Sequence, residues 1–336
     1  MIKESLYYDL SKPLAYNATY NFIAGARGLG KTYSAKRLAI KRFIKRGDMF
    51  IYLRRYKDEI RDSKTSFFSD ISHEFPDKEF RVIRNEAQIK NKGSKEWETM
   101  GYFVPLSTAQ RLKSVSYPKV TTIIFDEFII EKGMVRYIPS EFMVFNNFYS
   151  TVDRWKDKTT VLFLANSVSI DNPYFVGLDI HPDEMGEINV TNDGFVLCHF
   201  PEAKEFQTEV YKTRFGKFIS DTEYADYAVG NKFSDAGAEL VKGKSTKARY
   251  RFTLETKKGL FSVWFDSFTG EFFLQEKRPK EEIFYTIAAN KMSEEKVLLE
   301  NNNQVLQILR TAFRQAKMYF DKPSTRNAFI DIFRGW

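Results

Sequence analysis

The sequence predicts an α/β protein with a mostly parallel sheet, followed by a smaller α+β domain. Three observations predict this class. A glycine-rich stretch, GARGLGKT, lies between an apolar segment and a helical pattern at Gly25 to Thr32. A β-branched run at 120–125 ends in two adjacent carboxylates. Beyond residue 249, three short aromatic segments are separated by turn signals, as in an antiparallel meander.

The composition of the 336-residue chain fits a globular protein with more than one domain. No apolar run approaches the ~18 residues of a transmembrane helix. The N-terminus lacks the layout of a signal peptide, so export is not expected. One cysteine, Cys198, excludes a disulfide framework, and three histidines give no obvious zinc site. We expect Cys198 to be buried and the adjacent His199 to be structural.

The net charge of +8 is unevenly distributed along the chain. Residues 1–65 carry 15 basic and 6 acidic side chains, and residues 231–336 carry 19 and 13. The middle, residues 66–230, is acidic, with 18 and 25. Two basic zones around an acidic centre suit a protein that touches polyanions at two places, although an ordinary solvated surface is the alternative.

The glycine-rich stretch has the context of a phosphate-binding loop. An apolar strand is expected at Tyr20–Ala24, and a helix at Thr32–Arg46 that ends at Gly47. Main-chain N–H groups and the helix N-terminus bind phosphates in such a loop, while Lys31 reaches the β- and γ-phosphates and the Thr32 hydroxyl ligates Mg²⁺. The residues expected around the nucleotide are Gly25, Ala26, Arg27, Gly28, Leu29, Gly30, Lys31, Thr32 and Tyr33.

The carboxylate pair at Asp126 and Glu127 follows the run Val120–Phe125, which reads as a buried parallel strand. Ligands of open α/β sheets lie at the carboxyl ends of strands, so Asp126 is the expected Mg²⁺ partner. A carboxylate directly after it can orient and deprotonate an attacking water. Glu127 therefore indicates a nucleotide hydrolase.

Additional strands are expected between the loop and the carboxylates. Met49–Leu53 supplies one, and Thr99–Leu106 another, with Phe80–Arg84 as its expected partner. An inserted strand together with a catalytic glutamate is typical of the additional-strand, catalytic-glutamate division of P-loop ATPases, most of which are motors.

A helix and a strand are expected after the carboxylates. The helix covers Ser140–Trp155 and ends near Arg154, and the strand covers Thr160–Ala165 and ends in Asn166. An amide at the tip of the strand beside the carboxylate strand can hydrogen-bond the attacking water or the γ-phosphate. A strand-ending asparagine without a catalytic role fits the local sequence equally well.

The segments GARGLGKT, IYLRR, TTIIFDEF, STVDRW and FLANS occur in this order. Together they resemble the DNA-encapsidation ATPases of small Picovirinae-type tailed phages, a family grouped with FtsK/HerA-like translocases. The resemblance covers the whole chain, most specifically residues 20–170. It implies an ATP- and Mg²⁺-dependent motor that forms a ring of five subunits on the portal of an empty procapsid and pumps double-stranded DNA inward. A packaging RNA takes part in some members. Action in the host bacterial cytoplasm and absence from the mature virion are also implied.

The resemblance also implies roles for two arginines. Arg154 matches the position that completes the active site of the next subunit, and a surface arginine paired with Asp153 or Asp157 is the alternative. Arg54 matches an arginine that holds the catalytic glutamate inactive. The neighbouring Arg55 is the alternative for this role, because the match leaves the two positions undecided.

The far half of the chain resembles the family's small linker domain and its RNase H-like C-terminal domain. Its carboxylates Glu255, Asp266 and Glu271 are too scattered to assign to one metal pair. We therefore interpret the last domain as a vestigial nuclease used for docking, with a helix at Asn303–Phe320. The expected division is a motor domain at 1–200, a helical linker domain at 201–231, a flexible connection at 232–248 and the RNase H-like domain at 249–336.

Contacts with duplex DNA are expected to go to its phosphates, because a packaging motor is not sequence-specific. Two functional alternatives stay open. One is another double-stranded DNA translocase or a terminase with an active nuclease, and the other is a nucleotide-gated scaffold protein. The candidate DNA-binding residues are Lys57, Lys90, Lys92, Lys95, Lys132 and Arg136.

Overall fold

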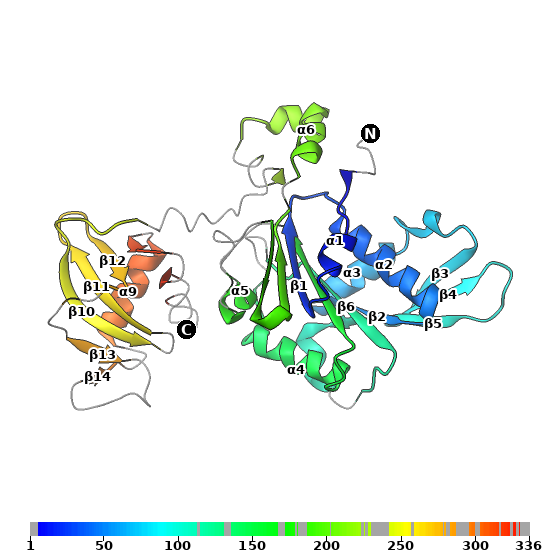
Figure 1. Cartoon of the computed structure of the whole chain (residues 1–336), viewed down its shortest axis with the longest axis horizontal. Coiled ribbons are helices and arrows are strands. Elements are labelled where there is room, and N and C mark those ends of the chain that lie inside the picture. The colour runs from blue at the N-terminus through cyan, green and yellow to red at the C-terminus, as the bar shows by residue number, and fades with distance from the viewer. Residues whose placement is uncertain are drawn as a thin grey trace. The chain divides into compact units, whose positions relative to one another are not determined.

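The chain folds into two compact units, and Figure 1 shows their elements. The first comprises Met1–Ser169 and Glu184–Ser234, and the second Ile170–Asp183 and Asp235–Trp336. The predicted four-part division stays a prediction. No helix among the described residues is long and apolar enough to cross a membrane. The computed structural model describes residues 6–112, 115–130, 136–166, 172–178, 180, 187–201, 203–222, 225, 228–229, 242–256, 259–277, 279, 283–286, 296–299, 303–315, 317–322, 325–326 and 329.

The described strands of the first unit form one nine-stranded sheet in the order β3-β4-β5-β2-β6-β7-β1-β9-β8. Six neighbouring strands of this order pair in parallel, namely β5, β2, β6, β7, β1 and β9. Strands β3, β4 and β8 pair antiparallel at the two edges. This confirms the predicted mostly parallel sheet. The strands are β1 (Tyr20–Gly25), β2 (Met49–Arg54), β3 (Lys78–Ile83), β4 (Glu86–Asn91), β5 (Glu98–Pro105), β6 (Val120–Asp126), β7 (Thr160–Asn166), β8 (Ile188–Thr191) and β9 (Val196–His199).

The strand inserted between the loop strand β1 and the carboxylate strand β6 is β7. The strand expected at Met49–Leu53 is confirmed as β2, which lies on the other side of β6. Local apolar periodicity identifies a strand but does not fix its place in the sheet. The expected pairing of Phe80–Arg84 with Thr99–Leu106 was wrong, because β4 lies between β3 and β5. That strand, EAQIKN, is polar and was not predicted.

Helices cover both faces of the central sheet, because successive strand residues point to opposite sides. On one face, the ring of Phe22 stacks on that of Phe163 at 4.1 Å between centroids, and Phe145 of α4 packs at 4.8 Å from Phe163. The next residue along β1, Ile23, shares a buried cluster with Ala39 of α2 on the other face. Figure 1 shows α2 and α4 on either side of these strands. The helices of this unit are α1 (Ser11–Leu14), α2 (Lys31–Arg46), α3 (Lys57–Ser66), α4 (Glu141–Asp153), α6 (Lys204–Lys212) and α7 (Arg214–Ile219), with 3₁₀ turns at Ser72–Glu74, Leu106–Leu112 and Asn192–Gly194.

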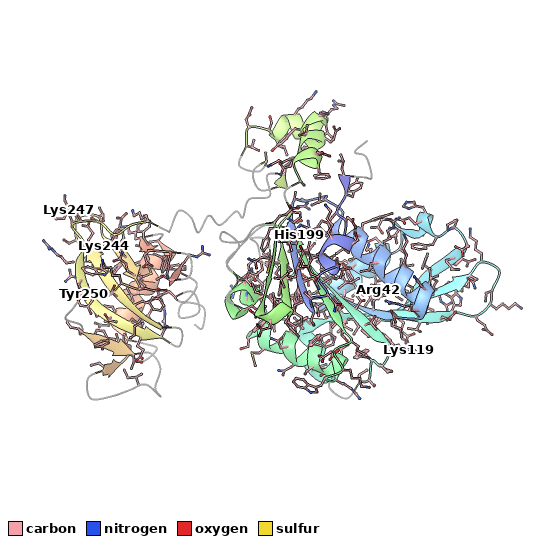
Figure 2. All side chains as sticks on the ribbon, in the orientation of Figure 1. Arg42, Lys119, His199, Lys244, Lys247 and Tyr250 are labelled. Atoms are coloured by element: carbon pink, nitrogen blue, oxygen red, sulfur yellow. The ribbon has the colours of Figure 1, made fainter. Side chains whose placement is uncertain are left out.

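The C-terminal ends of α2 and α4 confirm the helix ends that the sequence predicted. Gly47 follows α2 with φ of 72°, a conformation that suits glycine, and its N–H donates to the Phe43 carbonyl. Helix α4 ends at Asp153, and Arg154 is its left-handed C-cap. Cys198 is fully buried, as predicted. His199, labelled in Figure 2, is also buried, with Nδ1 at 2.7 Å from the Tyr8 hydroxyl.

The second unit contains a mixed sheet, with the described strands in the order β14-β13-β10-β11-β12-β15. The predicted three-stranded meander, β10 to β12, is confirmed. Two parallel strands extend it beyond β10, which is the order of an RNase H-like sheet, and β15 pairs in parallel with β12. These elements are β10 (Arg249–Thr256), β11 (Gly259–Asp266), β12 (Glu271–Gln275), β13 (Phe284–Thr286), β14 (Lys296–Leu298), β15 (Met318–Phe320), α5 (Pro173–Leu178) and α9 (Gln304–Arg314).

The predicted helix at Asn303–Phe320 was too long. Helix α9 ends at Arg314, and Met318–Phe320 is a strand in which the outer two residues are buried and the middle one is half-buried. This alternation has the period of a strand, so the last three residues were assigned to the wrong element. Part of the expected flexible connection, residues 232–241, lies outside the described residues.

Candidate functional site

The phosphate-binding loop connects β1 to α2 and has the backbone that its glycines permit. Gly28 and Gly30 have φ of 78° and 82°, in the left-handed region. A Cβ on Gly30 would also lie 3.1 Å from the ring of Tyr7, so a larger residue would be strained and crowded there. The loop residues Ala26 and Leu29 are buried, while Arg27 is exposed. This arrangement presents the N-terminus of α2 to a ligand.

Lys31 is the first residue of α2 and is buried. Its ammonium group donates hydrogen bonds to the carbonyl oxygens of Gly25 and Ala26, at 3.0 and 2.8 Å. Burial lowers the pKa of Lys31 to about 8, and the charge of Asp126 acts in the opposite direction. The loop therefore holds a buried cation whose charge depends on pH close to neutrality.

Asp126, at the end of β6, joins three elements of the site. One carboxylate oxygen accepts a hydrogen bond from the Thr32 hydroxyl at 2.9 Å, and the other accepts from the Tyr52 hydroxyl at 2.7 Å. Magnesium prefers oxygen ligands and is usually held by one or two carboxylates together with phosphate and water. The hydroxyl and carboxylate oxygens of Thr32 and Asp126 are of the type that fits this ion, and their role as its ligands stays a prediction.

Glu127 follows directly and has a left-handed backbone, with φ of 56°. Its side chain is 60 % exposed, and Oε2 lies 2.6 Å from the guanidinium of Arg54. Burial of the carboxyl group raises the pKa of Glu127, and the charge of Arg54 opposes this. Non-glycine residues in this conformation are uncommon and cluster at functional sites.

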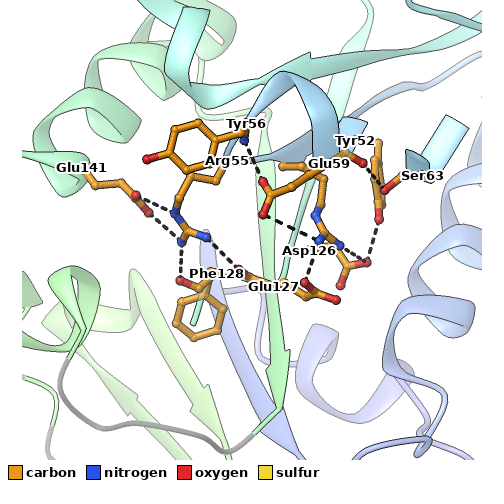
Figure 3. A network of polar contacts seen from close by, with 10 residues as sticks. Tyr52, Arg55, Tyr56, Glu59, Ser63, Asp126, Glu127, Phe128 and Glu141 are labelled. Atoms are coloured by element: carbon orange, nitrogen blue, oxygen red, sulfur yellow. Dashed lines mark hydrogen bonds and ion pairs between the residues drawn. The ribbon is translucent and has the colours of Figure 1, made fainter. Parts of the chain in front are cut away.

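Arg54 ends β2 and Arg55 follows it, and the two have different partners. Figure 3 labels Arg55 with Glu141 and Glu127. Arg54 contacts the Glu127 carboxylate and lies 3.8 Å from Asp126. Arg55 is fully buried and forms a bidentate pair with Glu141 at 2.7 and 2.9 Å. It also donates to the carbonyl of Phe128 at 2.7 Å. Thus Arg54, and not Arg55, is the arginine that contacts the glutamate side chain.

The buried pair of Arg55 and Glu141 was not predicted from the sequence. Its members are 86 positions apart, so no local pattern joins them. The guanidinium also donates to the Glu127 carbonyl at 3.3 Å, and the Glu141 carboxylate accepts from the N–H of Ile138 at 2.9 Å. The pair therefore ties the backbone of Glu127 to the start of α4.

A cavity of about 250 Å³ at the carboxyl edge of the sheet brings together part of the predicted site, whereas Gly25, Ala26, Arg27 and Arg54 do not line it. Asn166 lies there at the end of β7, the strand beside β6. A larger cavity of about 950 Å³ shares Gly30 and Tyr33 with it. The smaller cavity is lined by Gly28, Leu29, Gly30, Lys31, Thr32, Tyr33, Asp126, Glu127, Ala165 and Asn166.

Arg154 is exposed and does not line this cavity. It forms no ion pair with any residue that the structure describes, so the alternative of a pair with Asp153 or Asp157 has no support. The Asp153 carboxylate accepts backbone N–H groups instead.

The candidate DNA-binding residues differ in solvent exposure and in whether their charge is paired with an acidic side chain. Lys57 and Arg136 are exposed, as are Lys92 and Lys95 in the turn between β4 and β5. Lys90 is half-buried, and its ammonium lies 2.9 Å from Glu79, so its charge is already paired. Lys132 lies outside the described residues.

The second unit does not gather metal ligands among its described residues. No group of three or more histidine, cysteine, aspartate or glutamate side chains there could hold a metal ion. Asp266 accepts a hydrogen bond from Ser245 at 2.6 Å, and Glu271 pairs with Lys242 at 3.1 Å. Two of the three candidate nuclease carboxylates thus have local structural partners.

The fold and the site define a P-loop nucleoside triphosphatase of the additional-strand, catalytic-glutamate division, with β7 as the inserted strand. The chain belongs to the podovirus DNA encapsidation protein (Gp16) family, which matches residues 2–336. It is 36 % identical over 334 residues to the DNA packaging protein of Bacillus phage phi29, covering 98 % of each chain. The resemblance seen in the sequence is therefore confirmed.

Two solved structures are similar to this chain. One is the viral genome packaging motor assembly of bacteriophage phi29, with a TM-score of 0.72 and 35 % identity over 98 % of this chain and 99 % of that one. The other is the N-terminal domain of the DNA packaging ATPase of bacteriophage phi29. It has a TM-score of 0.54 and 40 % identity, and covers 60 % of this chain and 99 % of that one.

Proposed function

We propose that this protein is the ATP-driven motor that moves double-stranded viral DNA into an empty procapsid. The observation that carries the proposal is one cavity holding the phosphate loop, Asp126 and Glu127, in a chain of the encapsidation family. The family-level likeness supports a ring on the procapsid portal, formed in the infected host cell. A pentameric ring, a packaging RNA partner and absence from the virion are parts of the same proposal.

The residues of the cavity divide the work of ATP hydrolysis. Loop N–H groups and Lys31 hold the phosphates, and Thr32 and Asp126 hold Mg²⁺. When bound, Mg²⁺ neutralises phosphate charge and orients the terminal phosphate. Glu127 orients and deprotonates the attacking water, and Asn166 hydrogen-bonds that water or the phosphate. The larger cavity, which shares Tyr33 with the phosphate site, takes the nucleoside.

Arg54 regulates the reaction in this proposal. Its ion pair with Glu127 holds the carboxylate toward β2 and lowers its basicity while the contact lasts. Release of the pair frees Glu127 to accept a proton from water. The contact of 2.6 Å between the two side chains supports this role. A small movement between the ends of β2 and β6 would break such a direct pair.

Arg154 serves the active site of a neighbouring copy. The loop at 154–159 precedes β7, whereas the phosphate cavity lies at the other end of that strand. A seven-residue strand spans about 20 Å, which is far beyond the reach of an arginine side chain. This separation supports a role at the site of a neighbour in the ring, whose γ-phosphate Arg154 neutralises.

DNA-stimulated ATP turnover tests the proposed function. The purified protein is expected to hydrolyse ATP over many turnovers, faster with duplex DNA present, and to fill cognate empty procapsids. Exposed Lys57, Lys92, Lys95 and Arg136 are the proposed phosphate contacts. A protein whose turnover ignores duplex DNA and which fills no procapsid would be a nucleotide-gated scaffold instead. Metal-dependent DNA cleavage would favour a nuclease-active terminase, which the described carboxylates do not support.

Raising the pH is expected to weaken ATP binding through Lys31. In the free protein its pKa is about 8, so the ammonium is mostly charged below that pH and neutral above it. Binding a triphosphate requires the charged form, so the affinity falls by up to about tenfold per pH unit above that value. Titration with a fluorescent ATP analogue between about pH 7 and pH 9 measures this. Lys31→Arg is the control, because arginine stays charged throughout. An affinity of the unmodified protein that does not change with pH would contradict the prediction.

A further inference from the structure

Trp155 stands out among the apolar side chains of the surface. It is 89 % exposed, more than any other large apolar residue that the structure describes. Two of the remaining tryptophans, Trp97 and Trp264, are half-buried. An indole is a large apolar group that is usually covered, and tryptophan is among the residues most enriched in the energetic centres of protein interfaces. An almost fully solvated indole therefore needs an explanation.

The loop that carries Trp155 has a fixed shape. Arg154 and Trp155 both have left-handed backbones, with φ of 54° and 57°, and Asp157 has φ of 50°. The carboxylate of Asp153 is buried beneath the loop. It accepts four backbone N–H groups at 2.9 to 3.0 Å, from residues 156 to 159. Burial acts to raise the pKa of Asp153, but these hydrogen bonds outweigh it and the pKa is lowered, so the carboxylate stays charged at neutral pH.

Both sides of the loop are attached to the body of the protein. The Arg154 N–H donates to the Ser150 carbonyl of α4 at 2.9 Å, and the Lys158 ammonium donates to the Pro118 carbonyl before β6 at 2.6 Å. The loop thus displays a guanidinium and an indole next to each other from a prearranged backbone. Prearrangement lowers the entropy lost on binding, which is an advantage only if something binds.

The charges of the loop indicate what it meets. Arg154, Lys156 and Lys158 are basic and Asp157 is acidic, so the loop is positive on balance. The phosphate cavity has the opposite character, with Asp126 and Glu127 in its lining and a triphosphate as its proposed ligand. The loop lies at the edge of the sheet away from its own cavity. The cavity of a second copy is therefore the surface of opposite charge that we infer it meets.

We propose that Trp155 is a docking residue that packs against the next copy of this chain, beside that copy's phosphate cavity, and positions Arg154 for entry. The inference rests on the proposed function, because it presumes that Arg154 acts in a neighbour. Trp155 itself touches no reacting atom. It secures the interface, while Arg154 supplies the charge.

Assembly and turnover of the full-length Trp155→Ala protein test the proposal. The protein concentration for half-maximal ATPase activity is expected to rise about tenfold or more, with the plateau rate retained. Trp155→Phe is expected to recover part of the loss, because a phenyl ring keeps apolar contact area. Phe268→Ala is the matched control, since Phe268 is 80 % exposed and belongs to the second unit. It is expected to leave the concentration dependence unchanged.

Fluorescence reports the burial directly. On assembly, the emission of the unmodified protein is expected to shift to shorter wavelength and become less accessible to acrylamide, and Trp155→Phe is expected to lose that change. Normal assembly of Trp155→Ala, with an unaltered emission in the unmodified protein, would overturn the proposal. The proposal would also be overturned if the Trp155→Ala protein assembled normally but no longer bound duplex DNA, since DNA would then be the partner of Trp155. A different result would contradict the trans role of Arg154, namely a normal plateau rate of ATP turnover in the Arg154→Ala protein.

Discussion

Glu127→Gln is expected to reduce ATP turnover by about 10²- to 10⁴-fold, the usual contribution of a general base. Glutamine keeps the size of the side chain and its ability to hold a water molecule, but it cannot accept the proton. Lys31, Thr32 and Asp126 remain in place, so binding of ATP and of duplex DNA is expected to persist. The change should therefore separate binding from hydrolysis.

Single-turnover hydrolysis and binding of a fluorescent ATP analogue measure the two effects of this substitution. Glu59→Gln is the matched control. Glu59 lies 4.0 Å from the same arginine, Arg54, and its carboxylate accepts the N–H of Tyr56 at the start of α3. Glutamine can keep that hydrogen bond, so turnover should change little. If Glu127→Gln protein turned over ATP at close to the normal rate, another group would have to be the base.

The parts of the site that the sequence predicted are those encoded by short spacing. GARGLGKT specifies its own backbone, because Gly28 and Gly30 adopt left-handed conformations that other residues rarely do. Asp126 and Glu127 follow a continuous apolar run, and Asn166 ends another. In a parallel sheet the ends of such runs meet at one edge. The cavity was therefore predictable from local patterns combined with one rule of topology.

The order of the strands was less predictable. Met49–Leu53 and Thr160–Ala165 are both short apolar runs, and nothing in their composition shows that only the second inserts beside the loop strand. The antiparallel strand β4 was missed because its sequence is largely polar, as befits a strand near the edge of a sheet. Pairing partners are set by the packing of the whole layer, which a single segment does not encode.

The contacts of Arg54 and Arg55 decide which of the two meets the Glu127 side chain. Arg54 is the last residue of β2 and Arg55 follows it. Local sequence does not say which of them meets the glutamate. The structure places Arg54 against Glu127 and buries Arg55 against Glu141. Because Arg55 also holds the backbone at 127–128, the pair links Glu127 to α4, whose other end carries Arg154.

Arg154→Ala is expected to lower ATP turnover by about 10³- to 10⁵-fold, the usual contribution of an arginine supplied to a γ-phosphate. Lys31→Ala is expected to lose turnover because the phosphates lose their buried cation. If Arg154 acts on a neighbour, the two inactive proteins should complement each other. A Lys31→Ala subunit still carries Arg154, and an Arg154→Ala subunit still has an intact phosphate loop. In randomly mixed rings, about one quarter of the interfaces combine the two intact halves, since each interface is formed head to tail.

Mixing the two variants before assembly and measuring ATP hydrolysis tests the arrangement. Activity is expected to appear in the mixture although neither protein is active alone. The chain with both substitutions is the control, because mixing it with either single variant leaves no interface with two intact halves. A mixture no more active than its components would contradict the trans role. In contrast, Arg154→Ala protein with normal turnover would show that Arg154 is not needed for hydrolysis at all. Rescue would also show that the 20 Å separation along β7 divides one catalytic centre between two subunits, so that each ATP can be hydrolysed only with a neighbour's participation.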